Sequence, residues 1–226
     1  MDASSTAPCM RCLGTAENQF RADNGVISVS CRFNKATSSR CVRCISGKDM
    51  CETAPSGMAG DSVDLMLMLG FLRVLYRHTE EGDDGRPVYV FSEENRESFA
   101  VASHHLVQAF LSAVTTHLGQ FGMAGKRKPS PDTYYKYGAL VVARCRFNIE
   151  FVPPLVFAEG TTKDENMRVA CRLQIGDQGA VAWTDAKRSL FGLVRRAIQA
   201  DVEGENWRDV MERLGRHVVH VPTTFF

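Results

Sequence analysis

The sequence predicts a mainly α-helical fold, or an α+β fold with two strands, in which a small cysteine-rich module precedes a helical body. Six of the eight cysteines lie within the first 51 residues. Apolar residues then recur at helical spacing from residue 61 onward, and only two short stretches alternate as a strand does. The chain is 44% hydrophobic and 23% charged, which supports a buried core and excludes a wholly disordered chain.

The predicted module covers residues 1–58, and the predicted helical body covers residues 59–226. The cysteine-rich stretch ends near Pro55, and the composition of residues 56–60 is typical of a short flexible joint. At about 150 residues per domain, a chain of 226 residues allows one compact body and a small appendage.

Two helices with strong signals begin the body. The first follows Asp61 or Ser62, either of which is a suitable N-cap, and residues 82–87 form a turn after it. The second has Ser92 as its N-cap and two glutamates at its positive end. The apolar positions at helical spacing are Leu65, Leu69, Leu72 and Tyr76 in the first helix, and Phe99, Ala102, Leu106, Phe110, Ala113 and Leu118 in the second.

The second half of the body has weaker signals. Residues 134–144 have a helical pattern, whereas residues 145–151 alternate as a strand does. Residues 167–175 alternate again, so the second strand is predicted there. Two helices then complete the body, one capped by Thr184 and one over residues 207–214. Cys145 and Cys171 fall within apolar patterns and are expected to be buried free thiols.

The overall charge and hydropathy give no sign of general attraction to nucleic acid or lipid, or of a membrane-spanning segment. With 27 basic and 26 acidic residues the net charge is +1, so attraction to nucleic acid or anionic lipid requires a local patch. No stretch approaches the roughly eighteen apolar residues that cross a membrane, and residues 1–8 lack the pattern of a secretory signal. We therefore expect an intracellular protein with reduced thiols. The basic loop at residues 125–131 is interpreted as a solvated connector, with a nuclear-import signal as the alternative.

The first six cysteines follow the spacing C-x2-C-x18-C-x9-C-x2-C-x6-C. Two intervening residues let a tight turn direct both sulfurs of a pair at one tetrahedral metal ion. The two close pairs are also alike, because each contains an apolar residue followed by an arginine. The predicted metal ligands are Cys9, Cys12, Cys31, Cys41, Cys44 and Cys51.

Two ligand arrangements satisfy this spacing. In the first, Cys9, Cys12, Cys41 and Cys44 enclose a single ion, as in a zinc ribbon. In the second, all six cysteines bind two ions and two sulfurs bridge them. Zinc is the predicted metal because a closed thiolate site suits it, and an iron–sulfur cluster is the main alternative.

Basic residues surround the second close pair of cysteines. The stretch of residues 31–48 contains five lysines and arginines and no acidic residue. These cations can offset the negative charge of the thiolates, or they can bind phosphate. The candidate nucleic-acid-binding residues are Arg40, Arg43 and Lys48.

The half that contains Cys41-x2-Cys44-x6-Cys51 resembles the second half of the fungal binuclear zinc cluster. In that family six cysteines hold two zinc ions, and a short basic helix enters the DNA major groove. The family has a short lysine- and arginine-rich run between its second and third cysteines, whereas this chain has eighteen residues there with Arg21 as the only cation. The arrangement from Pro8 to Pro55 looks more like the cysteine-rich N-terminal segments of uncharacterised fungal proteins.

These observations predict a non-enzymatic zinc-binding protein. Its module is structural and presents a basic surface to a protein partner, to a second copy of the chain or to nucleic acid. The alternative is a sequence-specific DNA-binding transcriptional regulator of the fungal zinc cluster type, located in the nucleus. An enzyme is not predicted, because the histidines are scattered and the chain has no glycine-rich phosphate loop or nucleophile elbow.

Overall fold

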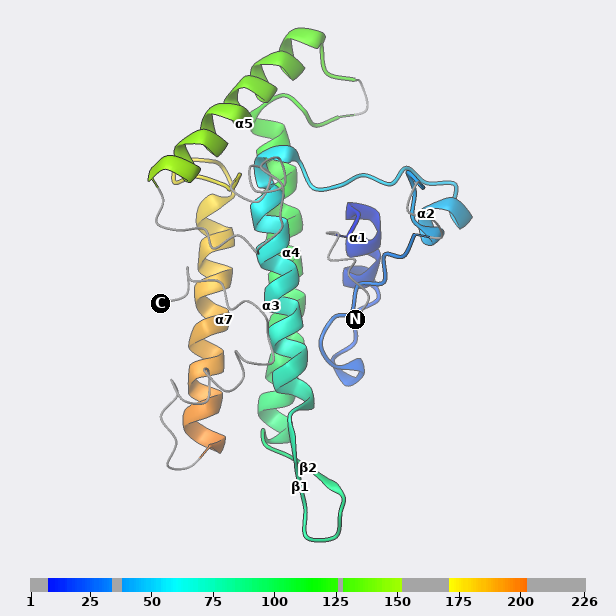
Figure 1. Cartoon of the computed structure of the whole chain (residues 1–226), viewed down its shortest axis with the longest axis vertical. Helices are drawn as coiled ribbons and strands as arrows, with labels where there is room; N and C mark the ends of the chain where they lie inside the picture. The colour runs from blue at the N-terminus through cyan, green and yellow to red at the C-terminus, as the bar shows by residue number, and fades with distance from the viewer. Residues whose placement is uncertain (1–7, 34–37, 126–127, 152–170, 203–226) are drawn as a thin grey trace.

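The computed structural model describes residues 8–33, 38–125, 128–151 and 171–202. The predicted mainly α class is confirmed, with a cysteine-rich segment that precedes a helical body (Figure 1). In chain order the elements are α1 (Met10–Asn18), η1 (Ala22–Asn24), α2 (Val42–Ser46), η2 (Ser56–Met58), α3 (Ala59–Arg77), β1 (Thr79–Glu81), β2 (Pro87–Tyr89), α4 (Glu93–Gln120), α5 (Pro131–Phe151) and α7 (Ala180–Asp201).

Helix α4 is the centre of the bundle, because α3, α7 and α1 all pack against it (Figure 1). Its predicted N-cap is confirmed: the Asn95 N–H donates to the Ser92 hydroxyl at 3.3 Å. At its middle, the Phe110 ring meets the Trp183 indole of α7 edge to face, with 5.4 Å between the ring centroids. Both side chains are fully buried, so this aromatic pair lies in the core that joins α4 to α7.

The N-terminal segment shares this core. Leu13, Val26 and Ile27 are buried in the same apolar cluster as the side chains of α3, α4 and α7. The backbone of the segment is tied to α4 as well, because the Ile27 N–H donates to the Ser103 hydroxyl at 3.0 Å. Helix α3 begins at Ala59, and the division of the chain at residue 58 stays a prediction.

A short antiparallel hairpin joins α3 to α4 where the sequence predicted only a turn. Strands β1 and β2 pair Thr79 with Tyr89, and Gly85 at φ +71° adopts the left-handed conformation that the turn requires. Strands of three residues are too short for an alternating pattern to be recognised. The Arg96 guanidinium lies 3.7 Å from the centroid of the Tyr89 ring and so packs the hairpin against α4.

The sequence left residues 145–151 open between helix and strand, and the structure continues helix α5 through them. Positions 145 and 149 alternate as in a strand but are also four residues apart, a spacing that suits a helix. The strand predicted over residues 167–175 is wrong where the structure describes it. Residues 171–175 form no strand; instead the Gly60 N–H donates to the carbonyl of Cys171 at 2.8 Å. The backbone of residues 171–173 thus contacts the start of α3, whereas the side chain of Ile175 is fully exposed. Residues 167–170 and the helix predicted over 207–214 lie outside the described residues.

The predicted helix caps at Asp61, Ser62 and Thr184 are also wrong. Helix α3 begins at Ala59 and α7 at Ala180, so all three residues lie inside helices. The Asp61 carboxylate is used elsewhere: it accepts hydrogen bonds from the Leu173 N–H and from the Trp183 indole N–H, both at 2.8 Å. A buried carboxylate at this place fixes α7 and residues 171–174 on α3.

Two buried ion pairs fasten the remaining segments to the bundle. Arg172 forms two hydrogen bonds with Asp64 at 2.9 and 3.1 Å, and Arg144 forms two with Asp177 at 2.6 and 2.7 Å. The forked geometry matches guanidinium to carboxylate and gives directional attachment. Cys171 is fully buried and free, as expected, and its burial raises the pKa of its thiol. None of the described helices has the length and apolar character needed to cross a bilayer.

The buried hydrogen bond from Trp183 to Asp61 predicts that the loss of stability on mutation of Trp183 depends on pH. Burial raises the pKa of Asp61 to about 6, so its contribution to stability is greatest below about pH 4 and is lost as the pH rises through 6. Trp183→Phe removes a donor to the ionised carboxylate, which costs about 1.5–3 kcal/mol near pH 7.5 and about 1 kcal/mol less when the carboxyl is protonated near pH 4.5. Urea unfolding at both pH values measures this. The loss of packing caused by the smaller phenylalanine ring is independent of pH. An equal loss in the free energy of unfolding at the two pH values would therefore contradict the prediction.

Candidate metal centre

Two similar turns place the close cysteine pairs. Cys9 is the N-cap of α1, and its sulfur accepts a hydrogen bond from the Cys12 N–H at 3.4 Å. Cys41 is the N-cap of α2, and its sulfur accepts from the Cys44 N–H at 3.5 Å. In each pair the helix starts directly after the first cysteine, which brings the second sulfur back beside the first. The repeat seen in the sequence is therefore also a repeat in structure.

The two remaining cysteines extend this repeat. The Cys9 N–H donates to the Cys31 sulfur at 3.4 Å. In the other half, the Cys51 sulfur lies in the same group as the sulfur of Cys41. Each capping cysteine thus has a more distant cysteine beside it, in addition to the one in its own helix. The sequence gives no sign of this second contact, because the distant cysteines have unequal spacings of x18 and x6.

The six sulfurs form two overlapping groups of four. Cys9, Cys12, Cys31 and Cys41 make one group, and Cys9, Cys41, Cys44 and Cys51 make the other; within each group the sulfurs all lie within 4.8 Å of one another. Cys9 and Cys41 belong to both groups. All six cysteines are free thiols. The structure therefore gathers every predicted ligand into a cluster that can hold metal.

The spacing of the sulfurs suits a tetrahedral thiolate site. Ligands at about 2.3 Å from one ion in tetrahedral geometry lie roughly 3.8 Å apart. The Cys9 sulfur is 3.6 Å from that of Cys44 and 3.9 Å from that of Cys41, and the Cys12 sulfur is 3.5 Å from that of Cys41. The grouping corresponds to the predicted arrangement with shared sulfurs, whereas the ribbon-like arrangement would leave out Cys31 and Cys51.

Burial and mutual hydrogen bonds shift the pKa values of these thiols in different directions. Burial raises the pKa values of Cys12 and Cys44, and it raises the pKa of Cys31 to about 11. Burial also acts to raise the pKa of Cys41, but hydrogen bonds from Cys44 and Cys12 outweigh it and lower the pKa to about 6. Metal binding therefore displaces protons from most of the cluster, and the metal affinity must fall as the pH is lowered.

The side of α1 away from the sulfurs is docked on α4 (Figure 1). Glu17 accepts hydrogen bonds from the His104 ring at 3.2 Å and from the Gln108 amide at 3.0 Å. The Phe20 ring stacks on His104, with 4.5 Å between the ring centroids. Sequence reasoning missed these docking residues, because they lie 80 or more positions apart and no local pattern links them.

Helix α2 lies on the outside of the cluster, away from the bundle (Figure 1). The candidate nucleic-acid-binding residues Arg40, Arg43 and Lys48 are all exposed there. The apolar side chains of Val42 and Ile45 are each 42% exposed. The outer surface of α2 is therefore both basic and partly apolar.

Comparison with models of known families, with curated proteins and with solved structures found no match. The interpretation of this site therefore depends on its own geometry and chemistry.

The shared sulfurs predict unequal effects of two serine substitutions. Cys41→Ser removes a ligand from both groups while the serine hydroxyl preserves the N-cap of α2. Cys12→Ser leaves the group of Cys9, Cys41, Cys44 and Cys51 complete. We expect Cys41→Ser to lose nearly all bound metal and Cys12→Ser to retain about one ion per chain.

Elemental analysis of protein purified in the presence of zinc measures both outcomes. Cys145→Ser, a substitution of a buried cysteine outside the cluster, is the matched control and should keep the wild-type metal content. Equal metal loss in Cys12→Ser and Cys41→Ser would show that the sulfurs are not shared as the structure places them.

Proposed function

We propose that the protein is a non-enzymatic zinc-binding protein whose N-terminal cysteines hold two zinc ions as a structural cluster. The observation that carries this proposal is the pair of four-sulfur groups that share Cys9 and Cys41. Two tetrahedral sites with two bridging sulfurs need six thiolates, and the cluster has six. This is also the ligand pattern of the fungal binuclear zinc cluster that the second half of the segment resembles.

Zinc fits the donor set better than the other metals considered. The ligands are all thiolates, the groups are four-coordinate, and four of the six sulfurs are shielded from solvent. An iron–sulfur cluster would add inorganic sulfide between the cysteines, whereas the spacing of 3.5–3.9 Å between cysteine sulfurs suits direct sharing of single ions.

The zinc is proposed to be structural because the segment has little apolar surface of its own to bury. Val42 and Ile45 are exposed, and Phe33 is 40% exposed. The buried apolar residues Leu13, Val26 and Ile27 belong to the core of the helical body instead. Metal binding then supplies free energy that burial within residues 38–51 does not.

The exposed surface of α2 is proposed to bind a protein partner, a second copy of the chain or nucleic acid. Helix α1 begins directly after Cys9 and packs on α4, so its inner face is not free to contact a partner. The surface around α2 has the combination of Arg40, Arg43 and Lys48 with exposed Val42 and Ile45. Its position and charge also support the alternative function, a DNA-binding regulator located in the nucleus.

Removal of zinc should release the N-terminal segment while the bundle persists. We expect a strong chelator to increase hydrogen–deuterium exchange in α1 and α2 by more than tenfold, because their caps and packing depend on the gathered sulfurs. Peptides from α4 and α7 serve as the internal control and should keep their protection over most of their length. If the purified protein contained no metal and chelator changed nothing, the structural-zinc proposal would be abandoned.

A duplex-DNA titration separates nucleic-acid binding from binding to a protein partner or to a second copy of the chain. Fluorescence anisotropy at low and high salt is measured for the zinc-loaded wild type, for Arg43→Glu/Lys48→Glu and for the control Arg195→Glu/Arg196→Glu, which makes the same charge change on exposed positions of α7. Salt-dependent binding that only the first double variant loses, with zinc content unchanged, supports the DNA-binding alternative. Absence of binding by the wild type at low salt rules that alternative out.

A further inference from the structure

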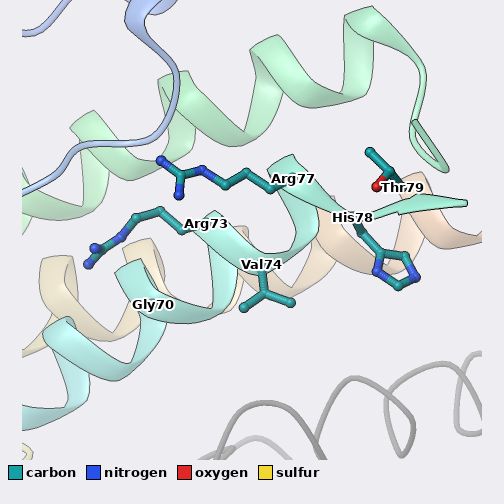
Figure 2. A pocket seen from close by; sticks show the side chains of 6 residues that line it. All are labelled: Gly70, Arg73, Val74, Arg77, His78 and Thr79. Atoms are coloured by element: carbon teal, nitrogen blue, oxygen red, sulfur yellow. The ribbon is translucent and has the colours of Figure 1, made fainter. Parts of the chain in front are cut away.

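A pocket of about 510 Å³ lies at the C-terminal end of α3, where the helix gives way to the hairpin. It is lined by Gly70, Arg73, Val74, Arg77, His78 and Thr79 (Figure 2). The pocket is near the hairpin, at the opposite end of α3 from η2, and none of the six cluster cysteines lines it (Figure 1). The pocket is therefore separate from the proposed zinc site.

Two arginines dominate the charge of this pocket. Arg73 and Arg77 are one helical turn apart, and their guanidinium groups extend in the same direction from α3 (Figure 2). Neither arginine takes part in an ion pair within the described part of the chain. The Arg73 Nε donates to the Leu69 carbonyl at 3.2 Å, which leaves its two terminal nitrogens for another partner.

The position of the arginines at a helix end explains only part of this arrangement. A cation in the last turn is favoured by the helix dipole, which accounts for Arg77. Two like charges at i and i+4 repel each other on one face of a helix and destabilise it. Burial and the neighbouring charge of Arg77 also lower the pKa of Arg73. A bound anion between the two guanidinium groups would remove this repulsion.

We propose that this pocket binds the phosphate group of a small phosphate monoester. Arg73 and Arg77 present planar donor groups that match phosphate oxygens. Gly70 has no heavy atom within 4 Å of the place where a side chain would begin, so a ligand can approach the helix there. The pocket is a recess that is largely open to solvent and has room for more than a bare phosphate ion.

The remaining lining residues suit the organic part of such a ligand. Val74 and His78 also line the pocket but project to a different side of α3 from the two guanidinium groups (Figure 2), so only a ligand that extends beyond its phosphate along the helix surface would reach them. Val74 offers apolar contact, and His78 and Thr79 offer hydrogen-bonding groups. The ester could come from a soluble metabolite or from a lipid headgroup, because both present the same terminal phosphate.

Isothermal titration at low ionic strength tests the proposal with inorganic phosphate, glucose 6-phosphate and glucose as probes. The lipid source is tested by co-sedimentation with phosphatidylcholine vesicles that contain phosphatidic acid, against vesicles of phosphatidylcholine alone. We expect the wild type to bind glucose 6-phosphate or the phosphatidic acid vesicles, to bind phosphate more weakly, and not to bind glucose. Binding of either ester-bearing probe supports the site and shows whether the phosphate ester comes from a soluble metabolite or from a lipid headgroup. If neither glucose 6-phosphate nor the phosphatidic acid vesicles bound at millimolar concentration, the proposal would be overturned.

Three variants connect binding to the pocket. Arg73→Gln/Arg77→Gln should weaken binding by about tenfold or more for each arginine removed, whereas the control Arg195→Gln/Arg196→Gln makes the same charge change on α7 and should bind as the wild type does. Gly70→Glu places a carboxylate beside the two arginines, so it should abolish binding. Equal binding by the double variant and the control would contradict the proposal.

The Gly70→Glu variant also keeps the test valid if the double glutamine variant fails to fold. Replacement of glycine inside a helix by glutamate favours the helix, because glycine loses more backbone freedom when it folds. This variant is therefore expected to melt at the wild-type temperature or above while it no longer binds phosphate. Retained binding in a folded Gly70→Glu protein would place the ligand elsewhere.

Discussion

The architecture of the N-terminal segment depends on the double use of Cys9 and Cys41. Each residue caps a helix through its sulfur, and each sulfur belongs to both groups of four. Helix start and ligand position are therefore fixed by the same atom. The part of the segment around α2, which exposes Phe33, Val42 and Ile45, has little else to specify its shape. The geometry of the cluster thus determines where α1 and α2 begin and how they face each other.

The cluster and the helical bundle form a continuous arrangement through α1. One side of this helix contributes Cys12 to the sulfur groups, and Leu13 from the same turn enters the core beside α4. The hydrogen bonds of Glu17 to α4 continue this attachment beyond the cluster. Helix α2 lies away from the bundle (Figure 1), and its basic and apolar side chains are exposed.

The sequence was sufficient to predict the parts of the structure that depend on local patterns. Helix α4 was predicted with its Ser92 cap, because a capping residue, acidic first turn and apolar stripe all agree. The close cysteine pairs were recognised because a two-residue spacing fixes sulfur geometry locally. Asp61 was mistaken for a cap because its partners, Leu173 and Trp183, are more than 100 residues away. The docking of Glu17 on His104 was missed for the same reason.

The attachment of α1 to α4 has a thermodynamic consequence. Because the same short helix contributes to the sulfur groups and to the interface with His104 and Gln108, the two equilibria are linked and the coupling free energy is reciprocal. If the cluster holds metal as proposed, a molecule that competes with α1 for the surface of α4 would weaken metal binding by the thiolates. Conversely, removal of the metal would loosen α1 and expose apolar surface on α4. Metal binding and access to that surface would then be coupled through the position of α1.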